Sequence, residues 1–332
     1  MTFFDFRYSA GRGLLQLGLS LLVALGAQTA LGQAFPLKPM KLVVPYPAGG
    51  SSDAMARLVG AEMAKTLGQP LLVENVAGAA GAIGVNLVAK SAPDGYTMIL
   101  SNFGPMSHLV ILDPNLPYHP LRDFAAVGQI YDAEYVLVGR PGLEANSVAQ
   151  IVALARAAPG RISYASAGAG GGTHLGFEYF GSAAKIDLLH IPFKGEQPGI
   201  TDLIADRIDL GMFSALTAMP LIKAGKMKAI AATGSRRLRA LPDLPTVSEA
   251  GLAGFEFSVF GGIHVPAATP APIIEKLSAA LIAAVKEPVV QERMNSQGMT
   301  PIGSRPEIYA GFLVREIDKW AAIIKQTGIK RE

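Results

Sequence analysis

Residues 42–58 have the sequence LVVPYPAGGSSDAMARL, and this stretch decides the fold. It opens with an apolar run typical of a buried strand, which prolines and glycines then interrupt. Apolar residues follow at helical spacing up to Leu67, and Gly68 and Pro70 end the helix. A strand therefore leads through a glycine-rich loop into a helix N-terminus, whose unpaired N–H groups and dipole favour an anion. Taken alone, the pattern is equally consistent with a loop that binds nothing.

The pattern recurs in the second half of the chain. Residues 162–166 are typical of a strand, residues 167–172 are all alanine or glycine, and Thr173 begins a helix that extends to about Ala184. Neither loop has the three-glycine dinucleotide fingerprint or a Gly-Lys-Ser/Thr phosphate loop. We therefore expect two lobes, each of which presents a helix N-terminus to one anionic ligand between them.

Strands alternate with helices along the chain, which predicts an α/β fold with a mostly parallel sheet and helices on both faces. Ligands of such sheets lie beyond the carboxyl ends of the strands. We expect the chain to cross between the lobes twice, through a strand interrupted at 131–134 and again at 255–265, as in proteins that close by hinge motion. Trp320 is expected to pack in the core, because tryptophan is mostly buried.

The N-terminal residues have the order of a secretory signal peptide. Arg7 and Arg12 precede an apolar run at residues 14–25, and small residues follow, so we expect cleavage after Ala34. The run is shorter than the roughly 20 residues that span a bilayer, although a retained anchor is the alternative. The chain has no cysteine, which excludes disulfides and a lipid-modified cysteine. We therefore expect a protein that diffuses freely in an extracytoplasmic space.

Charge and motifs argue against nucleic acid binding and catalysis. The formal net charge is +3, from 29 basic and 26 acidic residues, and the basic residues are scattered along the chain. The histidines show no metal-ligand spacing, and no Gly-x-Ser-x-Gly elbow occurs. We expect no metal, no cofactor and no catalytic residue. The alternative is a secreted serine-dependent hydrolase that uses Ser51 or Ser166, because only the fold places a base beside a serine.

Short motifs throughout the chain resemble the Bug-type (TctC-like) receptors, the extracytoplasmic solute-binding components of tripartite tricarboxylate transporters. The motifs are residues 39–50 with Asp53 and Arg57, residues 73–75, 93–97, 121–124, 191–195, 201–203, 241–246 and 249–251. They stand in the family's order, and they cover the sequence after the leader from end to end.

The resemblance implies a periplasmic-binding-protein-like α/β fold, with two αβ lobes joined by two hinge crossings around a ligand cleft. We place the signal peptide at 1–34, lobe 1 at 35–133 and 262–332, and lobe 2 at 134–261. The implied function is capture of a small carboxylate, aliphatic or aromatic, for the membrane permease subunits of a tripartite transporter or for a sensor ectodomain. We expect a monomer without enzymatic activity.

Carried onto this chain, the family's binding mode places ligand contacts in both glycine loops and just after other strands. The predicted ligand-binding residues are Tyr46, Ala48, Gly49, Gly50, Ser51, Asp53, Ser101, Ser166, Gly168, Thr173, His174, Lys194 and Ser214. Lys194 is either a charged ligand contact or a solvated loop lysine.

Two features depart from the family pattern. Many members of the family it resembles carry aspartate or asparagine just after the strand that ends at Phe213, where this chain has residues 214–216, Ser-Ala-Leu. Asp132 and Glu134 lie in a crossing where members of that family are commonly neutral. A carboxylate near the cleft repels an acidic ligand unless it meets a cationic group. The two acidic residues therefore indicate either a zwitterionic ligand, such as an amino acid, or a solvated pair on the hinge surface.

Overall fold

The computed structural model describes residues 35–168, 171–193 and 195–328. The predicted signal peptide and Lys194 lie outside these ranges. None of the helices within them combines the length and apolar character that a bilayer crossing requires. The chain from Pro39 onward forms one compact unit, to which the following description applies.

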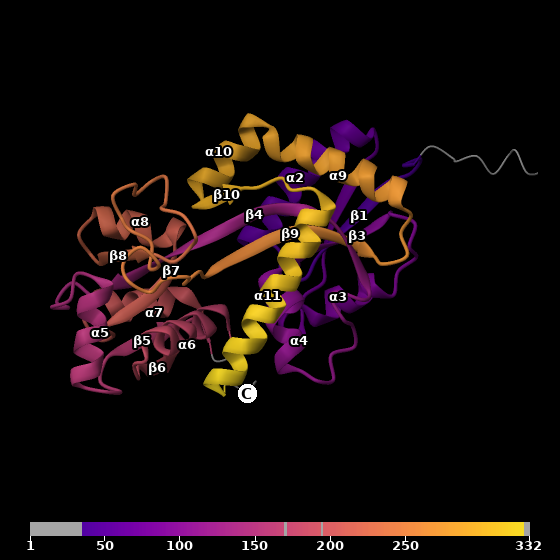
Figure 1. The fold of residues 1–332 in the computed structure, drawn as a ribbon. Coiled ribbons are helices and arrows are strands. Elements are labelled where there is room, and N and C mark those ends of the chain that lie inside the picture. Colours follow the sequence, from indigo (N-terminus) through magenta and orange to yellow (C-terminus); the bar gives the residue numbers. More distant parts are fainter. Residues whose placement is uncertain (1–34, 169–170, 194, 329–332) are drawn as a thin grey trace, which may run out of the picture. The chain divides into compact units, whose positions relative to one another are not determined.

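Strands and helices alternate along this unit (Figure 1). The first part contains β1 (Met40–Val44), α2 (Ser51–Leu67), β2 (Leu71–Asn75), the short helix η1 (Ala79–Gly81), α3 (Ala82–Ala89), β3 (Thr97–Asn102), η2 (Gly104–His108), α4 (Leu109–Leu112) and β4 (Phe124–Gly139). The middle part contains α5 (Val148–Ala157), β5 (Ser163–Ser166), α6 (Gly172–Ala184), β6 (Leu189–Pro192), α7 (Glu196–Ile204), β7 (Leu210–Ser214), α8 (Ala215–Lys223) and β8 (Lys228–Ala232). The last part contains β9 (Ser258–Pro266), α9 (Ala271–Lys286), α10 (Pro288–Ser296), β10 (Met299–Pro301) and α11 (Pro306–Thr327).

The strands of the described residues form a 10-stranded mixed sheet in the order β2-β1-β3-β9-β4-β7-β5-β6, with β8 and β10 also paired to β4. Pairing is parallel at the two ends, where β1 lies between β2 and β3 and β5 lies between β6 and β7. Pairing is antiparallel in the centre, among β3, β9, β4 and β7. The expectation of a mostly parallel sheet is therefore wrong for the centre, because β4 and β9 carry the chain across it in opposite directions.

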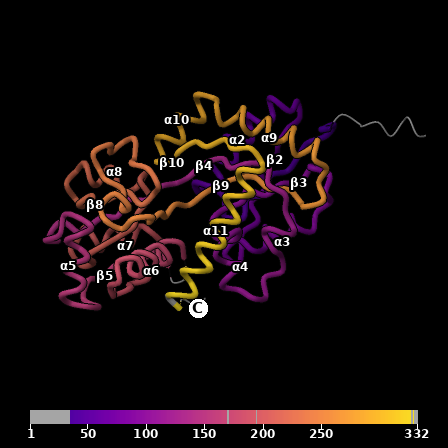
Figure 2. Tube along the Cα trace, viewed as in Figure 1, coloured from indigo at the N-terminus to yellow at the C-terminus, as the bar shows by residue number. Residues whose placement is uncertain are grey.

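β4 is one continuous strand of 16 residues, so the predicted interruption at 131–134 is wrong. Its first part pairs with β9 as far as Glu134, opposite Ser258, and its second part pairs with β7 from Tyr135, opposite Ser214. Figure 2 shows β4 and β9 side by side between the β1–β3 elements and the β5–β8 elements. The change of partner between Glu134 and Tyr135 thus marks the junction of the two groups of elements.

The predicted strand–loop–helix unit is present. β1 lies between two strands, which explains why Leu42, Val43 and Val44 are fully buried. The apolar face of α2 is buried, and Gly68 ends the helix at a φ of 72°, which glycine adopts without steric cost. Trp320 of α11 is fully buried, as predicted, and packs against both Phe103 and Phe257.

Candidate functional site

A cavity of about 530 Å³ lies where the N-terminus of α2 meets the junction in β4. It is lined by Tyr46, Pro47, Ala48, Gly50, Ser51, Ser52, Asn102, Tyr131, Ala133, Glu134, Tyr135, Glu196, Ser214, Leu216, Val259, Gln297, Gly298 and Met299. These residues come from the β1–α2 loop and the start of α2, the end of β3, the middle of β4, the start of α7, the end of β7, the start of α8, β9, and the segment from the end of α10 into β10. The lining therefore draws on both groups of elements.

The α2 loop presents backbone N–H groups to this cavity. Gly50 is the N-cap residue of α2 and no side chain caps the helix, so the first N–H groups of α2 lack an intrahelical partner. Gly50, Ser51 and Ser52 line the cavity at this point. The positive end of the helix dipole lies there as well, which makes the position suitable for a carboxylate.

Asp53 holds the loop in shape and is not among the cavity-lining residues. Its Oδ2 accepts a hydrogen bond from the backbone N of Gly49 at 2.9 Å and another from Arg57 Nε at 3.2 Å. Gly49 has a φ of 88°, a conformation that favours glycine. The bond from Arg57, followed by that from Gly49, lowers the pKa of Asp53 to about 2. A charged Asp53 therefore fixes the turn that exposes the neighbouring amides.

Hydroxyl and amide groups line the cavity beside this loop. Burial raises the pKa values of Tyr46, Tyr131 and Tyr135, so all three are neutral hydroxyls that can donate hydrogen bonds. Asn102 is only 3% exposed, and its Nδ2 donates to the hydroxyl of Tyr131 at 3.3 Å. The Oδ1 of Asn102 has no partner within the described residues.

Two carboxylates complete the polar lining. Glu134 is 6% exposed and accepts a hydrogen bond from Thr300 Oγ1 at 3.3 Å. Glu196 begins α7 and accepts bonds from the backbone N of Ser214 at 2.6 Å and from Thr217 Oγ1 at 2.9 Å. Burial raises the pKa of both carboxyls. Glu134 is thus not the solvated hinge-surface residue of one interpretation, but part of the cavity wall.

Asp132 does not line the cavity. Its Oδ1 accepts a hydrogen bond from Gln129 Nε2 at 2.8 Å, and β10 pairs with β4 alongside it. Burial, followed by the negative charges of Glu256 and Glu134, raises the pKa of Asp132 to about 7. Only one member of the acidic pair therefore faces the cavity.

The structure brings Tyr46, Ala48, Gly50, Ser51 and Ser214 together in the lining. Gly49 and Asp53 are not in the lining, but the hydrogen bond between them stabilises the same loop. Ser101 lies elsewhere, buried at 3.0 Å from Tyr309 Oη and 2.8 Å from His264 Nδ1. It stabilises the packing of β3, β9 and α11.

Side chains next to the second glycine loop satisfy part of its described backbone. Thr173 Oγ1 accepts a bond from the backbone N of Ala167 at 2.9 Å, and Ser166 Oγ accepts one from Gly168 N at 3.2 Å. His174 stacks on His190 with ring centroids 3.9 Å apart. None of Ser166, Gly168, Thr173 and His174 is among the residues that line the cavity. Their contact with a ligand stays a prediction, and Lys194 lies outside the described residues.

Ser166 has a histidine neighbour, but no carboxylate among the described residues bonds that histidine. Its Oγ lies 2.7 Å from His190 Nε2, while burial lowers the pKa of His190 to about 4, which makes the ring a weak base. In the described residues, the carboxylate of Glu178 bonds Tyr164 and pairs with His174, not with His190. The described ranges also hold no group of three or more His, Asp or Glu side chains suited to a metal ion.

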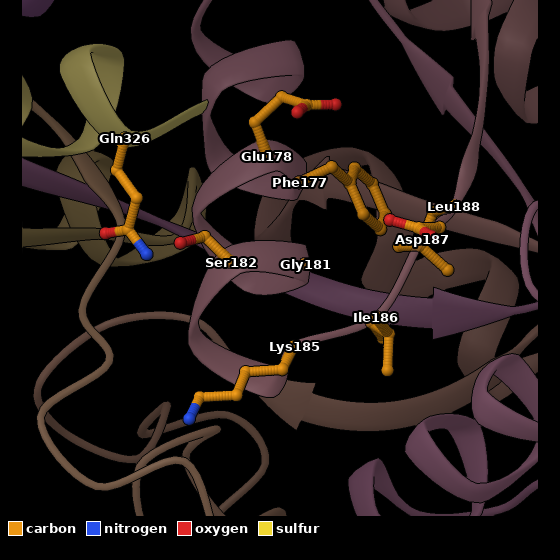
Figure 3. A pocket seen from close by; sticks show the side chains of 9 residues that line it. All are labelled: Phe177, Glu178, Gly181, Ser182, Lys185, Ile186, Asp187, Leu188 and Gln326. Carbon is orange, nitrogen blue, oxygen red and sulfur yellow. The ribbon is translucent and has the colours of Figure 1, made fainter. Parts of the chain in front are cut away.

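A second cavity of about 410 Å³ lies at the other end of α6 (Figure 3). Its lining residues are Phe177, Glu178, Gly181, Ser182, Lys185, Ile186, Asp187, Leu188 and Gln326. In Figure 3, most of these side chains extend from α6 and the segment after it, and Gln326 reaches in from α11. None of the predicted site residues lies there.

Sequence reasoning missed Glu196, Tyr131, Tyr135 and the segment from Gln297 to Met299. Glu196 had a weak signal, since it opens a helix after a loop that follows a strand. The Gln297–Met299 segment had none, because its position depends on the pairing of β10 with β4 and on the close approach of Gly298 to Ala215.

Comparison with known proteins identifies the family. Residues 55–329 match the TctC family, described as the tripartite tricarboxylate transporter family receptor. An uncharacterised protein family member from the TAR-I ttuE-ttuC' intergenic region of Agrobacterium vitis is 39% identical over 298 residues, which cover 89% of this chain and 86% of that protein. The protein BugT of Bordetella pertussis is 33% identical over 315 residues, which cover 95% and 97% of the two chains.

Solved structures agree with this match. A protein of R. palustris with adipate has a TM-score of 0.75 and 29% identity, and the match covers 90% of this chain and 99% of that one. The protein MatC from Rhodopseudomonas palustris with bound malate has a TM-score of 0.72 and 33% identity, over 87% and 100% of the two chains. These similarities do not support the serine hydrolase alternative, and the family consists of receptors that bind substrates. The chain has their α/β periplasmic-binding-protein fold, and it belongs to the TctC (Bug) family of tripartite tricarboxylate transporter receptors.

Proposed function

We propose that this chain captures a small carboxylate in the cavity at the α2 N-terminus and delivers it to the membrane permease subunits of a tripartite transporter. The observation that carries this proposal is the uncapped N-terminus of α2, which lines the cavity through Gly50, Ser51 and Ser52. Adipate and malate in the two R. palustris relatives support a carboxylate as the ligand class.

The proposed contacts are charge-assisted hydrogen bonds. Each bond from an N–H or hydroxyl group to a buried carboxylate contributes about 1.5–3 kcal/mol. The amides of α2 and the neutral hydroxyl of Tyr46 are donors of this kind, and the turn that presents them is fixed by Asp53. The ligand therefore meets donors that are already oriented, which limits the entropy lost on binding.

Closure of two lobes completes the proposed mechanism. We place lobe 1 at 35–133 and 262–332 and lobe 2 at 134–261, with β4 and β9 as the two crossings. The change of pairing partner between Glu134 and Tyr135 supports a bending point there. Closure brings Ser166, Gly168, Thr173, His174 and Lys194 toward the ligand, and the permease recognises the closed form.

The proposed location is the periplasm, because two similar solved structures are described as periplasmic proteins. Export requires a leader, for which we propose cleavage after Ala34. The mature protein acts as a monomer that binds its ligand without chemical turnover, and its partner is the permease subunits or, alternatively, a sensor ectodomain.

A thermal-shift screen over mono-, di- and tricarboxylates and aromatic acids tests the function. A ligand that binds only the folded chain stabilises it by about 2.7 kcal/mol at 100 times its Kd. We expect at least one small carboxylate to raise the Tm in this way and to be recovered unchanged. The proposal fails if no carboxylate shifts the Tm at millimolar concentration, and a hydrolysed ester or amide ligand would favour the hydrolase.

A further inference from the structure

The two ends of the proposed carboxylate site have opposite chemistry. At the α2 end, the lining offers backbone N–H groups and hydroxyls that can donate hydrogen bonds to a ligand. At the junction end, the lining contains the carboxylates of Glu134 and Glu196. Among the described residues that line the cavity, none is Lys, Arg or His. A dicarboxylate placed across the cavity would set one of its charges beside these carboxylates. Arg236, whose positive charge offsets part of the rise in the pKa of Glu134, is not among the lining residues.

Glu134 and Glu196 line the cavity from two different elements. Glu134 is followed in β4 by Tyr135, and the Cα partner of Tyr135 in β7 is Ser214. The backbone N of Ser214 donates to Glu196 Oε1 at 2.6 Å, and the negative charge of Glu196 contributes to the raised pKa of Tyr135. Glu196 is therefore fixed at the end of β7, while Glu134 lines the same cavity from β4, where Thr300 bonds its carboxylate.

Asn102 provides an independent observation that points to a donor on the ligand. Asn102 is only 3% exposed, and it lines the cavity. Its Nδ2 donates a hydrogen bond to the hydroxyl of Tyr131, whereas its Oδ1 accepts no hydrogen bond within the described residues. A buried acceptor without a partner is costly, and a ligand N–H group would satisfy it.

We infer that the ligand is a small acid that also carries an ammonium group, with Glu134 and Glu196 as the residues that select for it. The inference rests on the proposed carboxylate site, and it adds that the ligand carries an ammonium group at its other end. The carboxylate binds at the α2 N-terminus, and the ammonium group donates hydrogen bonds to the two glutamates and to Asn102. Replacing a ligand carboxylate with an ammonium group turns repulsion at the junction into attraction.

Matched ligand pairs test this inference by isothermal titration calorimetry. Each pair has the same number of methylene groups and differs only at one end: succinate and β-alanine, glutarate and 4-aminobutyrate, adipate and 5-aminovalerate. L-Aspartate and L-glutamate test an ammonium group beside the carboxylate. We expect the wild type to bind at least one amino acid at least tenfold more tightly than the acid that lacks its ammonium group.

Three variants identify the selecting residues. Truncating one partner of a buried charge pair typically weakens binding at least about 30-fold, so Glu134→Gln and Glu196→Gln are expected to lose the amino acid preference. Both substitutions keep the side-chain shape, and circular dichroism checks the fold. Asp132→Asn is the control, because Asp132 lies on the same strand outside the lining and is expected to change the ratio less than about threefold.

The outcomes separate this inference from the function on which it rests. If dicarboxylates bind more tightly than every amino acid partner, the inference is overturned while the carboxylate site stands. If Asp132→Asn changes the preference as much as Glu134→Gln does, the overall electrostatic potential of the cavity selects the ligand, and the assignment to the two glutamates is wrong. If the chain binds neither class, the proposed function itself fails.

Discussion

Glu196 Oε1 accepts a hydrogen bond from the backbone N of Ser214 at 2.6 Å, which brings a carboxylate to the end of β7. The small serine side chain leaves room for Glu196, whose carboxylate also bonds Thr217. The acidic group at the end of β7 is thus supplied by α7, the helix that precedes this strand.

Substituting Ser214→Asp tests this relationship. A second carboxylate beside Glu196 repels it, so we expect the free energy of unfolding to fall by roughly 1–3 kcal/mol. The double variant Ser214→Asp with Glu196→Gln removes one charge and is expected to recover most of the loss. Urea denaturation at pH 7.5 measures both. An equal loss in the single and double variants would show that size, not charge, causes it.

Asp132→Asn is expected to stabilise the protein in a pH-dependent way. The folded-state pKa of Asp132 is raised to about 7, so between its ordinary pKa and pH 7 only the unfolded chain gives up the proton. The wild type therefore loses stability from this group as pH rises through that interval, and the neutral variant does not. We expect an advantage of about 2–4 kcal/mol at pH 7.5 that disappears near pH 4.

Chemical denaturation of wild type and Asp132→Asn at the two pH values checks this prediction. A difference between them that is the same at pH 4 and pH 7.5 would mean that the carboxyl of Asp132 ionises in the folded protein as it does in the unfolded chain.

Trp320→Ala is expected to destabilise the chain by about 3–5 kcal/mol. The indole is fully buried against Phe103 and Phe257, and its Nε1 donates to Glu316 Oε2 at 3.0 Å. Val314→Ala on the same helix is the control, since Val314 is 42% exposed and is expected to cost less than about 0.5 kcal/mol. Urea unfolding measures the free energy of unfolding of both variants. A similar decrease in the two would show that Trp320 is not part of the hydrophobic core.

Gly49→Val is expected to abolish ligand binding while the fold persists. An added Cβ at Gly49 meets no atom within 4 Å, so the effect comes from a φ of 88° that valine disfavours. The turn then shifts and no longer presents the amides of α2. Gly225→Val is the matched control, because Gly225 also has a positive φ, of 67°, and open space around it, in the turn after α8.

Calorimetric titration with the best ligand from the screen compares the two glycine variants. We expect Gly225→Val to bind like the wild type and Gly49→Val to lose at least about 30-fold in affinity, the equivalent of about 2 kcal/mol. Equal affinity in both variants would exclude the β1–α2 loop as the binding element.

The sequence predicts local units better than their partners. The β1–α2 unit was predicted correctly because its apolar run, glycines and helical spacing lie within 30 residues of one another. The continuity of β4 was not, because residues 131–134 are ordered by antiparallel pairing with β9, far along the chain. The mixed sheet follows from the same long-range pairing, which no local pattern encodes.

The candidate site divides in the same way. The loop residues Tyr46, Gly50 and Ser51 were predicted from local pattern and line the cavity. Glu196 was missed because its role depends on Ser214, which lies 18 residues further along the chain, at the end of β7. The second loop resembles the first in sequence, yet Thr173 and Ser166 satisfy part of its backbone, a pairing that side-chain geometry decides.

The most direct test of the account is a crystal structure of the chain with the most tightly bound small carboxylate. We expect a carboxylate oxygen of the ligand to lie about 2.7–3.2 Å from a backbone N of Gly50, Ser51 or Ser52. A ligand bound instead in the cavity between α6 and Gln326, with the amides of α2 left to solvent, would contradict it.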